Sequence, residues 1–342
     1  MNYETILYKM ICTKVAKNHE IVAKFWQDLC CSYGRKGLFL SGTIKKRNQM
    51  RIAVLGANGF IGRRILQRLA GSGAHTLLGV SRQPDLLPSS GYRFEQVDLC
   101  QREAVEELLA RFRPEVVFNT VAMSSVDFCQ QHPAEAYAIN VEAVATLVEL
   151  CNRQACRLIH LSTDFVFEGT QQVPYTEEDR PAAVNLYGQQ KAEAERIIQE
   201  ACRDYAIMRV EVVYGTPYPG QHGNIVQLVK TRLGNGQPIQ VVSDQVRTPT
   251  WVEDIARGAE LLVPSAHQGI FHICGGEAMS IAEIAYRVAR HFRLDESLIR
   301  PVTTAALQEA TPRPRYTAMS IAKAQRSIGY QATSLEEALA HC

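Results

Sequence analysis

Three residues near the middle of the chain have the types and spacing needed for redox chemistry on a carbon–oxygen bond. Tyr187 and Lys191 are four residues apart in NLYGQQKAEAERII, and Thr163 precedes them in HLSTDFVFEG. Side chains four apart on one helix face can touch. An ammonium beside a phenol favours the phenolate, and so lowers the phenol's pKa from its ordinary value of about 10. With Thr163 holding a nearby oxygen, the trio predicts a site that reduces a carbonyl or oxidises an alcohol.

Alternating strand and helix patterns before these residues predict the sheet that would position them. Apolar runs typical of strands buried on both faces occur at residues 51–55, 75–80, 92–97, 115–118 and 157–161. Helical patterns lie between them, notably at residues 103–112 and 133–153. This rhythm predicts a Rossmann-type, doubly wound α/β fold whose ligands bind at the carboxyl ends of parallel strands. Thr163 falls at one of these ends.

A glycine-rich stretch, GANGFIG, follows the first expected strand and runs directly into a helical pattern. Glycines here allow a tight turn and a close approach of the backbone to a pyrophosphate, and the helix N-terminus supplies free N–H groups. In the order strand, loop and helix, the motif predicts a dinucleotide site. Its residues would be Gly56, Asn58, Gly59, Phe60, Ile61 and Gly62.

The end of the second expected strand bears on the choice of cofactor. Ser81 and Arg82 stand there in place of an acidic residue. A carboxylate would accept hydrogen bonds from the ribose hydroxyls of NAD(H), whereas a cation would bind the 2′-phosphate of NADP(H). We therefore expect NADP(H) to be preferred, with NAD(H) as the alternative because Asp85 follows closely.

Composition argues against several other classes of protein. The 342 residues, 46% hydrophobic and 21% charged, are typical of a soluble globular protein with about two domains. A net charge of +2 gives no reason to expect nucleic acid or a membrane surface as a partner. The nine histidines form no HxxxH or HExxH motif, so we expect no metal site. His160 lies inside an apolar strand, which favours a core residue. We expect a cytoplasmic protein.

Taken together, the motifs resemble the extended short-chain dehydrogenase/reductase superfamily, and within it the dTDP-4-dehydrorhamnose reductases. The resemblance covers residues 50–329. Its landmarks are, in order, GANGFIG, VDFCQQHPAEAYAINVEAVATL, STDFVFEG with PYTEED, YGQQK with AEAE, MRVEVVYG, DQVRTPTWVEDIA and RPRYTAMS. Seven motifs in this order are far more specific than any one of them alone.

The resemblance implies an NAD(P)-dependent oxidoreductase that acts on a nucleotide-linked 4-keto-6-deoxy sugar. Tyr187 would donate the proton to the reduced carbonyl oxygen, and Thr163 would hydrogen-bond that oxygen. Lys191 would bind the nicotinamide ribose and lower the phenol's pKa. Homodimers are common in the superfamily. Further cofactor contacts would come from Asp98, Leu99, Ala122 and Met123.

After Gly215 the strand–helix rhythm breaks, and we expect a smaller, discontinuous C-terminal substrate-binding domain. The nucleotide-binding domain would comprise residues 50–215 and 248–273, and the substrate-binding domain residues 216–247 and 274–342. Guanidinium groups bind phosphate bidentately, so Arg247, Arg313 and Arg315 are candidates for a diphosphate clamp. The expected substrate contacts are Thr163, Asp164, Val212, Asn224, Arg247 and Arg313.

Two departures from the family pattern leave the sugar open. The rhamnose enzymes typically carry a tryptophan at the position of Val212, and Asn-Phe where this chain has Asn224-Ile225. A nucleotide-sugar epimerase or dehydratase is an alternative, although Asp164 is followed by Phe165 in place of the glutamate expected for dehydration. A non-catalytic NADP-binding subunit, like the regulatory subunit of methionine adenosyltransferase, is a second alternative.

Residues 1–49 differ in character from the rest of the chain. They contain lysines throughout and lack the apolar segment of a secretory signal. Met50 begins MRIAVLGANGFIG, where a nucleotide-binding fold normally starts. We interpret residues 1–49 as an N-terminal extension from an over-long reading frame whose natural start is Met50. A regulatory or partner-binding arm is the alternative.

Overall fold

The computed structural model of the protein describes residues 49–86, 91–221, 223–307 and 309–342. These residues belong to the unit Asn48–Cys342, and everything below concerns that unit. The N-terminal extension expected at residues 1–49 lies, apart from its last residue, outside the described part of the chain.

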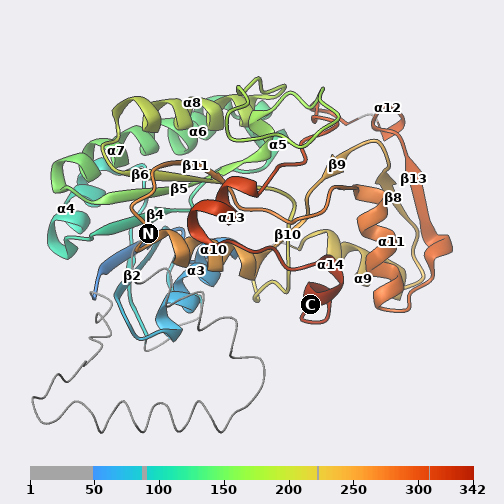
Figure 1. Cartoon of the computed structure of the whole chain (residues 1–342), viewed down its shortest axis with the longest axis horizontal. Helices are drawn as coiled ribbons and strands as arrows, with labels where there is room; N and C mark the ends of the chain where they lie inside the picture. The colour runs from blue at the N-terminus through green and yellow to red at the C-terminus, as the bar shows by residue number, and fades with distance from the viewer. Residues whose placement is uncertain (1–48, 87–90, 222, 308) are drawn as a thin grey trace, which may run out of the picture. The chain divides into compact units, whose positions relative to one another are not determined.

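A seven-stranded parallel sheet forms the centre, in the order β11-β6-β5-β4-β1-β2-β3 (Figure 1). The order changes direction between β1 and β4, and sheets of this kind bind ligands at that point. The predicted doubly wound α/β fold is therefore confirmed. The strands are β1 (Arg51–Leu55), β2 (Thr76–Ser81), β3 (Arg93–Gln96), β4 (Val116–Asn119), β5 (Arg157–Thr163), β6 (Tyr205–Val210) and β11 (Gly269–His272).

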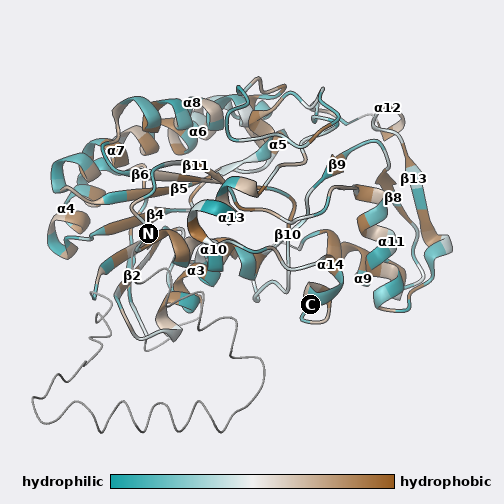
Figure 2. Ribbon diagram, viewed as in Figure 1, coloured by the Kyte–Doolittle hydropathy of each residue, from teal (hydrophilic) through white to brown (hydrophobic). Residues whose placement is uncertain are grey.

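Helices cover both faces of the sheet, because alternate strand side chains point to opposite sides and the central strands carry apolar residues on both. Ile52 and Val54 of β1 pack towards one set of helices, while Ala53 and Leu55 pack towards the other. Figure 2 shows the hydrophobic strands enclosed between helices with hydrophilic outer faces. One face carries α3 (Phe60–Gly71), α10 (Val252–Leu262) and α13 (Ala322–Ile328); the other carries α4 (Arg102–Phe112), α7 (Ala143–Gln154) and α8 (Leu186–Ala201).

The helix expected at residues 133–153 is present but is interrupted by a π-helical turn. It consists of α6 (Pro133–Tyr137), the π turn Ala138–Glu142 and α7. Such turns frequently mark functional sites. Asn140 in the turn is buried, and its side chain accepts from Met123 N at 2.9 Å and donates to Gln190 Oε1 at 2.9 Å. The turn thereby ties the loop after β4 to α8.

A smaller α/β layer follows the main sheet in the chain and has a hydrophobic core of its own. Its core elements are α9 (Ile225–Gly234), β8 (Ile239–Val242), α11 (Ile281–His291), β13 (Ile299–Val302) and α14 (Leu335–Leu339), with β8 parallel to β13. A separate core agrees with the predicted division of the chain into two domains. The exact domain boundaries stay a prediction.

Short elements complete the described chain. The strand pairs are β7 (Val213–Tyr214) with β10 (Thr250–Trp251), and β9 (Val246–Arg247) with β12 (Met279–Ser280). The short helical elements are α5 (Val126–Gln131), α12 (Thr304–Leu307) and the 3-10 turns Asp164–Val166 and Glu296–Leu298. Among the residues described, no helix combines the length and apolarity needed to cross a bilayer.

A buried ion pair joins α8, which carries two residues of the predicted catalytic trio, to the sheet. Glu195 of α8 accepts from Arg209 of β6 through both carboxylate oxygens, at 2.6 and 2.9 Å. Neither side chain is more than 1% exposed. The Arg209 guanidinium also lies over the Phe167 ring, 4.9 Å from its centroid. Because removal of one partner leaves a buried charge uncompensated, this pair should be sensitive to substitution.

We predict that Glu195→Gln lowers the free energy of unfolding by about 3 kcal/mol or more, since Arg209 then loses its counter-charge in the core. Glu200→Gln is the matched control on the same helix, because Glu200 forms an exposed pair with Arg196. The control should cost less than about 1 kcal/mol. Urea unfolding curves of both variants measure the difference. Equal losses in the two variants would show that the buried pair does not anchor α8.

Candidate active site

A cavity of about 530 Å³ lies at the carboxyl ends of the central strands. The glycine-rich loop, the ends of β4 and β5, the first turns of α8 and the segment after β6 all contribute to its wall. The sequence therefore identified residues from distant parts of the chain that the fold brings to one cavity. The predicted residues in the wall are Asn58, Gly59, Phe60, Ile61, Gly62, Ala122, Thr163, Asp164, Tyr187, Lys191, Val212 and Asn224.

The glycine-rich loop is closed tightly against the end of β4. Gly56 has a φ of +87°, a conformation that side chains disfavour. A Cβ on Gly62 would lie 2.3 Å from the Gly56 carbonyl oxygen and 2.6 Å from Thr120 Oγ1. Thr120 in turn donates to Leu55 O at 2.7 Å. The loop thus has no room for side chains at Gly56 and Gly62.

The N-terminus of α3 fits the phosphates of a dinucleotide. Gly59, the N-cap residue, is exposed and supplies no side-chain hydrogen bond, and no acidic residue occupies the first turn. The first backbone N–H groups of a helix without such a cap can bind an anion, and the helix dipole favours negative charge there. The residues present therefore fit a dinucleotide whose phosphates would lie against Gly59 and the start of α3.

The first turn of α8 places Tyr187 beside Thr163. Asn185 caps the helix by accepting from Gly188 N at 2.9 Å. A Cβ on Gly188 would be 2.0 Å from the Phe165 carbonyl oxygen, so α8 approaches the segment after β5 more closely than any other residue type would allow. Burial raises the pKa of the Tyr187 phenol above its ordinary value, and a hydrogen bond with Thr163 opposes that rise. The phenol is therefore protonated at neutral pH.

Lys191 lies on the same face of α8, and its ammonium is held by the strand β5. The Lys191 Nζ is 2.8 Å from His160 Nε2 and donates to Leu161 O at 2.8 Å. Burial lowers the pKa of Lys191 to about 8, and the nearby Glu195 carboxylate raises it. Burial dominates the pKa of the phenol, and the expected lowering of that pKa by Lys191 stays a prediction.

His160 contacts Lys191, and the sequence did not reveal this contact. It is fully buried, as expected of a core residue, yet it contacts the lysine of the trio. Its Nδ1 is 3.2 Å from Asn119 Nδ2, and Asn119 Oδ1 accepts from Val121 N. Burial and the Lys191 charge lower the pKa of His160 well below its ordinary range. The ring is thus neutral, and it fixes Lys191 without adding charge.

The end of β2 is organised by an arginine that sequence analysis missed. Arg63, buried in α3, donates to Asn58 Oδ1 at 2.9 Å and to Asp85 Oδ1 at 2.5 Å. The Tyr92 hydroxyl donates to the other Asp85 oxygen at 2.9 Å. Asp85 therefore has structural partners, while the Arg82 side chain is exposed at the strand end. The signal that was available is the arginine directly after the last glycine of GANGFIG.

Several predicted contacts lie outside the cavity wall. Asp98 accepts from Cys100 N at 3.0 Å, and Leu99 is buried in the core between the sheet and α4. The Met123 backbone is held by Asn140. Arg313 is 27% exposed and pairs with Glu309 at 2.8 Å and with Asp127 at 3.4 Å. The other predicted residues outside the wall are Gly56, Ser81, Arg82 and Arg247.

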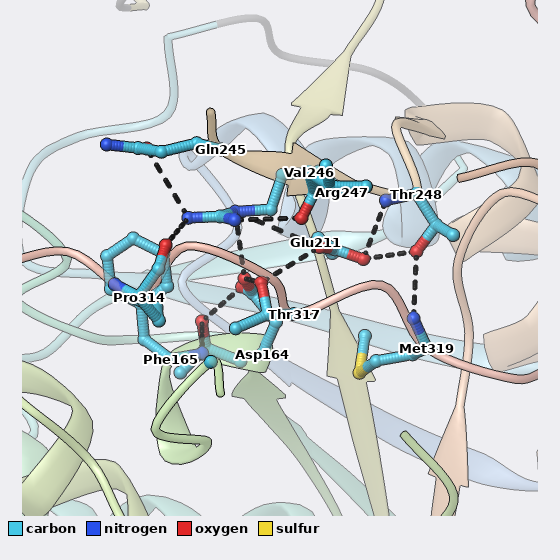
Figure 3. A network of polar contacts seen from close by, with 12 residues as sticks. Asp164, Phe165, Glu211, Gln245, Val246, Arg247, Thr248, Pro314, Thr317 and Met319 are labelled. Atoms are coloured by element: carbon cyan, nitrogen blue, oxygen red, sulfur yellow. Dashed lines mark hydrogen bonds and ion pairs between the residues drawn. The ribbon is translucent and has the colours of Figure 1, made fainter. Parts of the chain in front are cut away.

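Arg247 is buried in a polar network, which does not fit its predicted role in a diphosphate clamp (Figure 3). Its Nε lies 3.5 Å from Asp164 Oδ2 and 3.9 Å from Glu211 Oε1. Its terminal nitrogens donate to the carbonyl oxygens of Pro314 at 2.6 Å and of Val246 at 2.8 Å. The guanidinium is only 2% exposed, so Arg247 joins segments of the protein and does not present its charge to a ligand.

Two other predicted substrate residues, Asn224 and Val212, lie in the cavity wall. Asn224 caps α9: its Oδ1 accepts from Val226 N at 3.1 Å and its Nδ2 donates to Gly215 O at 2.8 Å. Val212 has a φ of +35°, which is rare for a β-branched residue. Backbone strain of this kind concentrates at functional sites. Val212 therefore presents a small side chain to the cavity from an unfavourable backbone conformation.

The fold and the cavity together define an extended short-chain dehydrogenase/reductase. Residues 50–342 match the sequence model of the RmlD substrate binding domain. The chain belongs to that family. Its relatives among known proteins confirm the resemblance to dTDP-4-dehydrorhamnose reductases.

Three relatives illustrate the range of the family. Methionine adenosyltransferase 2 subunit beta of Mus musculus is 32% identical over 260 residues, which cover 74% of this chain and 75% of the relative. The dTDP-4-dehydrorhamnose reductase of Aggregatibacter actinomycetemcomitans is 28% identical over 301 residues, covering 84% and 97%. The crystal structure of dTDP-4-dehydrorhamnose reductase from Bacillus anthracis in complex with NADP has a TM-score of 0.75 at 25% identity, covering 85% and 96%.

We predict that Gly62→Ala raises the Kd for NADPH at least about tenfold, because the added methyl would displace the Gly56 carbonyl and open the loop. Gly71→Ala, in the same helix, is the matched control, since its Cβ would meet nothing within 4 Å. That change should leave the Kd unaltered and raise stability by up to about 1 kcal/mol. Fluorescence titration with NADPH measures both affinities. An unchanged Kd in Gly62→Ala would contradict the placement of the dinucleotide.

Proposed function

We propose that the protein is an NADP(H)-dependent reductase of a nucleotide-linked 4-keto-6-deoxy sugar, similar in activity to dTDP-4-dehydrorhamnose reductase. The observation that carries the proposal is the meeting of Thr163, Tyr187 and Lys191 in one cavity with the uncapped N-terminus of α3. The NADP complex of the B. anthracis reductase supports the cofactor. A nucleotide-sugar substrate and a cytoplasmic location follow from the same proposal, and a homodimer stays a prediction.

Each residue of the trio has a part in the reduction. Bound NADPH supplies the hydride to the carbonyl carbon. The protonated Tyr187 phenol gives its proton to the carbonyl oxygen as negative charge develops there, which is general acid catalysis. The Thr163 hydroxyl holds that oxygen beside the phenol. Lys191, with a pKa of about 8, is mostly an ammonium at neutral pH and would bind the ribose hydroxyls of the cofactor.

The electrostatics of the strand end support NADP(H) over NAD(H). Asp85 is paired with Arg63 and Tyr92, so its carboxylate has other partners than a ribose. Arg82 is exposed at the end of β2, where the 2′-phosphate of NADP(H) would lie. A charge-assisted hydrogen bond between the two would favour NADP(H).

A non-catalytic subunit is the second candidate, favoured by the 32% identity with methionine adenosyltransferase 2 subunit beta. Such a protein would bind NADP(H) without turnover. An epimerase or dehydratase would turn over a nucleotide sugar without net oxidation of NADPH. Net NADPH oxidation therefore separates the proposed reductase from both.

We predict that Tyr187→Phe lowers the kcat for NADPH-dependent reduction of dTDP-4-keto-6-deoxy sugars by about 10²–10⁴, because the general acid is lost. Tyr137→Phe is the control: Tyr137 lies on α6 and its hydroxyl donates to Glu193 at 2.9 Å. Steady-state loss of NADPH absorbance measures both variants, and NADPH titration checks that binding is retained. Wild-type turnover in Tyr187→Phe would refute the catalytic assignment.

We predict that Arg82→Ala weakens NADPH binding by about tenfold to a hundredfold and leaves NADH binding unchanged, as expected for the loss of about 1.5–3 kcal/mol from a charged hydrogen bond. Arg93→Ala, an exposed arginine on the neighbouring β3, controls for the general effect of charge. Isothermal titration with each cofactor gives the preference directly. Arg82 has no role in the preference if NADPH affinity survives its removal.

A further inference from the structure

Directly behind Thr163, two buried carboxyl groups share one cation among the residues that the structure describes. Asp164 follows β5 and Glu211 follows β6; both are buried, and both reach the cavity wall. Arg247 is the cation that faces them, at 3.5 and 3.9 Å. The other titratable groups that face them, Cys274, Tyr316 and Tyr187, are neutral in their protonated forms. With both carboxyls ionised, the cluster would hold a net negative charge inside the protein, which burial opposes.

The hydroxyl of Thr317 bridges the two carboxyl groups (Figure 3). Its Oγ1 is 2.5 Å from Asp164 Oδ2 and 3.1 Å from Glu211 Oε1. A hydroxyl has one hydrogen, so it can donate a hydrogen bond to only one carboxylate oxygen. At the other contact the hydroxyl oxygen must accept, and the carboxyl there must carry a proton. The arrangement of donors and acceptors thus calls for one additional proton.

The other oxygen of each carboxyl group already accepts hydrogen bonds. Glu211 Oε2 accepts from Thr248 N at 2.9 Å and from the Thr248 hydroxyl. Asp164 Oδ1 accepts from the Thr163 hydroxyl at 3.0 Å, and the Thr163 oxygen in turn accepts from Phe165 N at 3.2 Å. The missing hydrogen is therefore at the two contacts with Thr317.

We propose that Asp164, Thr317 and Glu211 hold one shared proton at neutral pH. Glu211 carries it at Oε1 and donates it to the Thr317 hydroxyl oxygen, and the Thr317 hydroxyl donates its own hydrogen to Asp164 Oδ2. Asp164 stays ionised, faces Arg247 and accepts from the Thr163 hydroxyl through its other oxygen.

The pKa directions agree with this geometry. Burial raises the pKa of Glu211 to about 8, the Asp164 charge adds to the rise, and Arg247 opposes it. Burial also raises the pKa of Asp164. Because the folded pKa of Glu211 lies above its ordinary value of 4.5, the stabilisation is complete below pH 4.5 and is lost as pH rises towards about 8.

Glu211→Gln tests the shared proton through stability, without any need for turnover. The amide oxygen can accept from Thr248 and the amide N–H can donate to Thr317, as a protonated glutamate would. The unfolding equilibrium constant of the wild type relative to Glu211→Gln should rise by up to about tenfold per pH unit between about pH 5 and 8. Glu200→Gln is the exposed control and should show no such trend. A flat ratio for Glu211→Gln overturns the shared proton.

Infrared spectroscopy of the wild type provides a second test that does not depend on how a variant folds. A protonated carboxylic acid band should be present at neutral pH and absent from Glu211→Gln, where Asp164 alone balances Arg247. Absence of the band from the wild type contradicts the proposal. The band together with no turnover of any keto sugar would support the shared proton and refute the reductase function.

Discussion

The packing of α8 against the ends of β5 and β6 is the constraint on which the site depends. The buried pair of Glu195 and Arg209 fixes the helix to β6, and Gly188 lets its first turn approach the Phe165 carbonyl. With the helix so placed, Tyr187 and Thr163 meet and Lys191 reaches β5. Because these contacts are buried, the packing of the protein itself places the three side chains, which favours positioning of the reacting groups.

The fold, and the residues of the trio that line one cavity, could be predicted from the sequence because they depend on local patterns, while the catalytic roles stay a prediction. Buried parallel strands have apolar runs, GANGFIG is a contiguous loop, and Tyr187 and Lys191 share one helix. The contacts of His160 and Arg63 could not be predicted, since their partners come from other elements. The π turn at Asn140 was missed because helical periodicity does not reveal one extra residue in a turn.

Arg247 illustrates that the position of an arginine near an expected substrate loop in the sequence is not enough to assign it to a phosphate. In the sequence it differs little from Arg313, yet one is buried and the other is partly exposed. The distinguishing feature is the pair of carboxyls, Asp164 and Glu211, which lie on strand ends far from it in sequence. Thr317 of the C-terminal segment completes the cluster, because its hydroxyl contacts both carboxyl groups.

The most direct measurement follows a labelled hydride. The protein is incubated with NADPH that carries deuterium at the transferred position and with a dTDP-4-keto-6-deoxy sugar, and the products are analysed by mass spectrometry. The account predicts one deuterium in the reduced sugar for each NADPH oxidised. A sugar that is changed without deuterium, or NADPH that stays bound and unoxidised with every keto sugar offered, would contradict it.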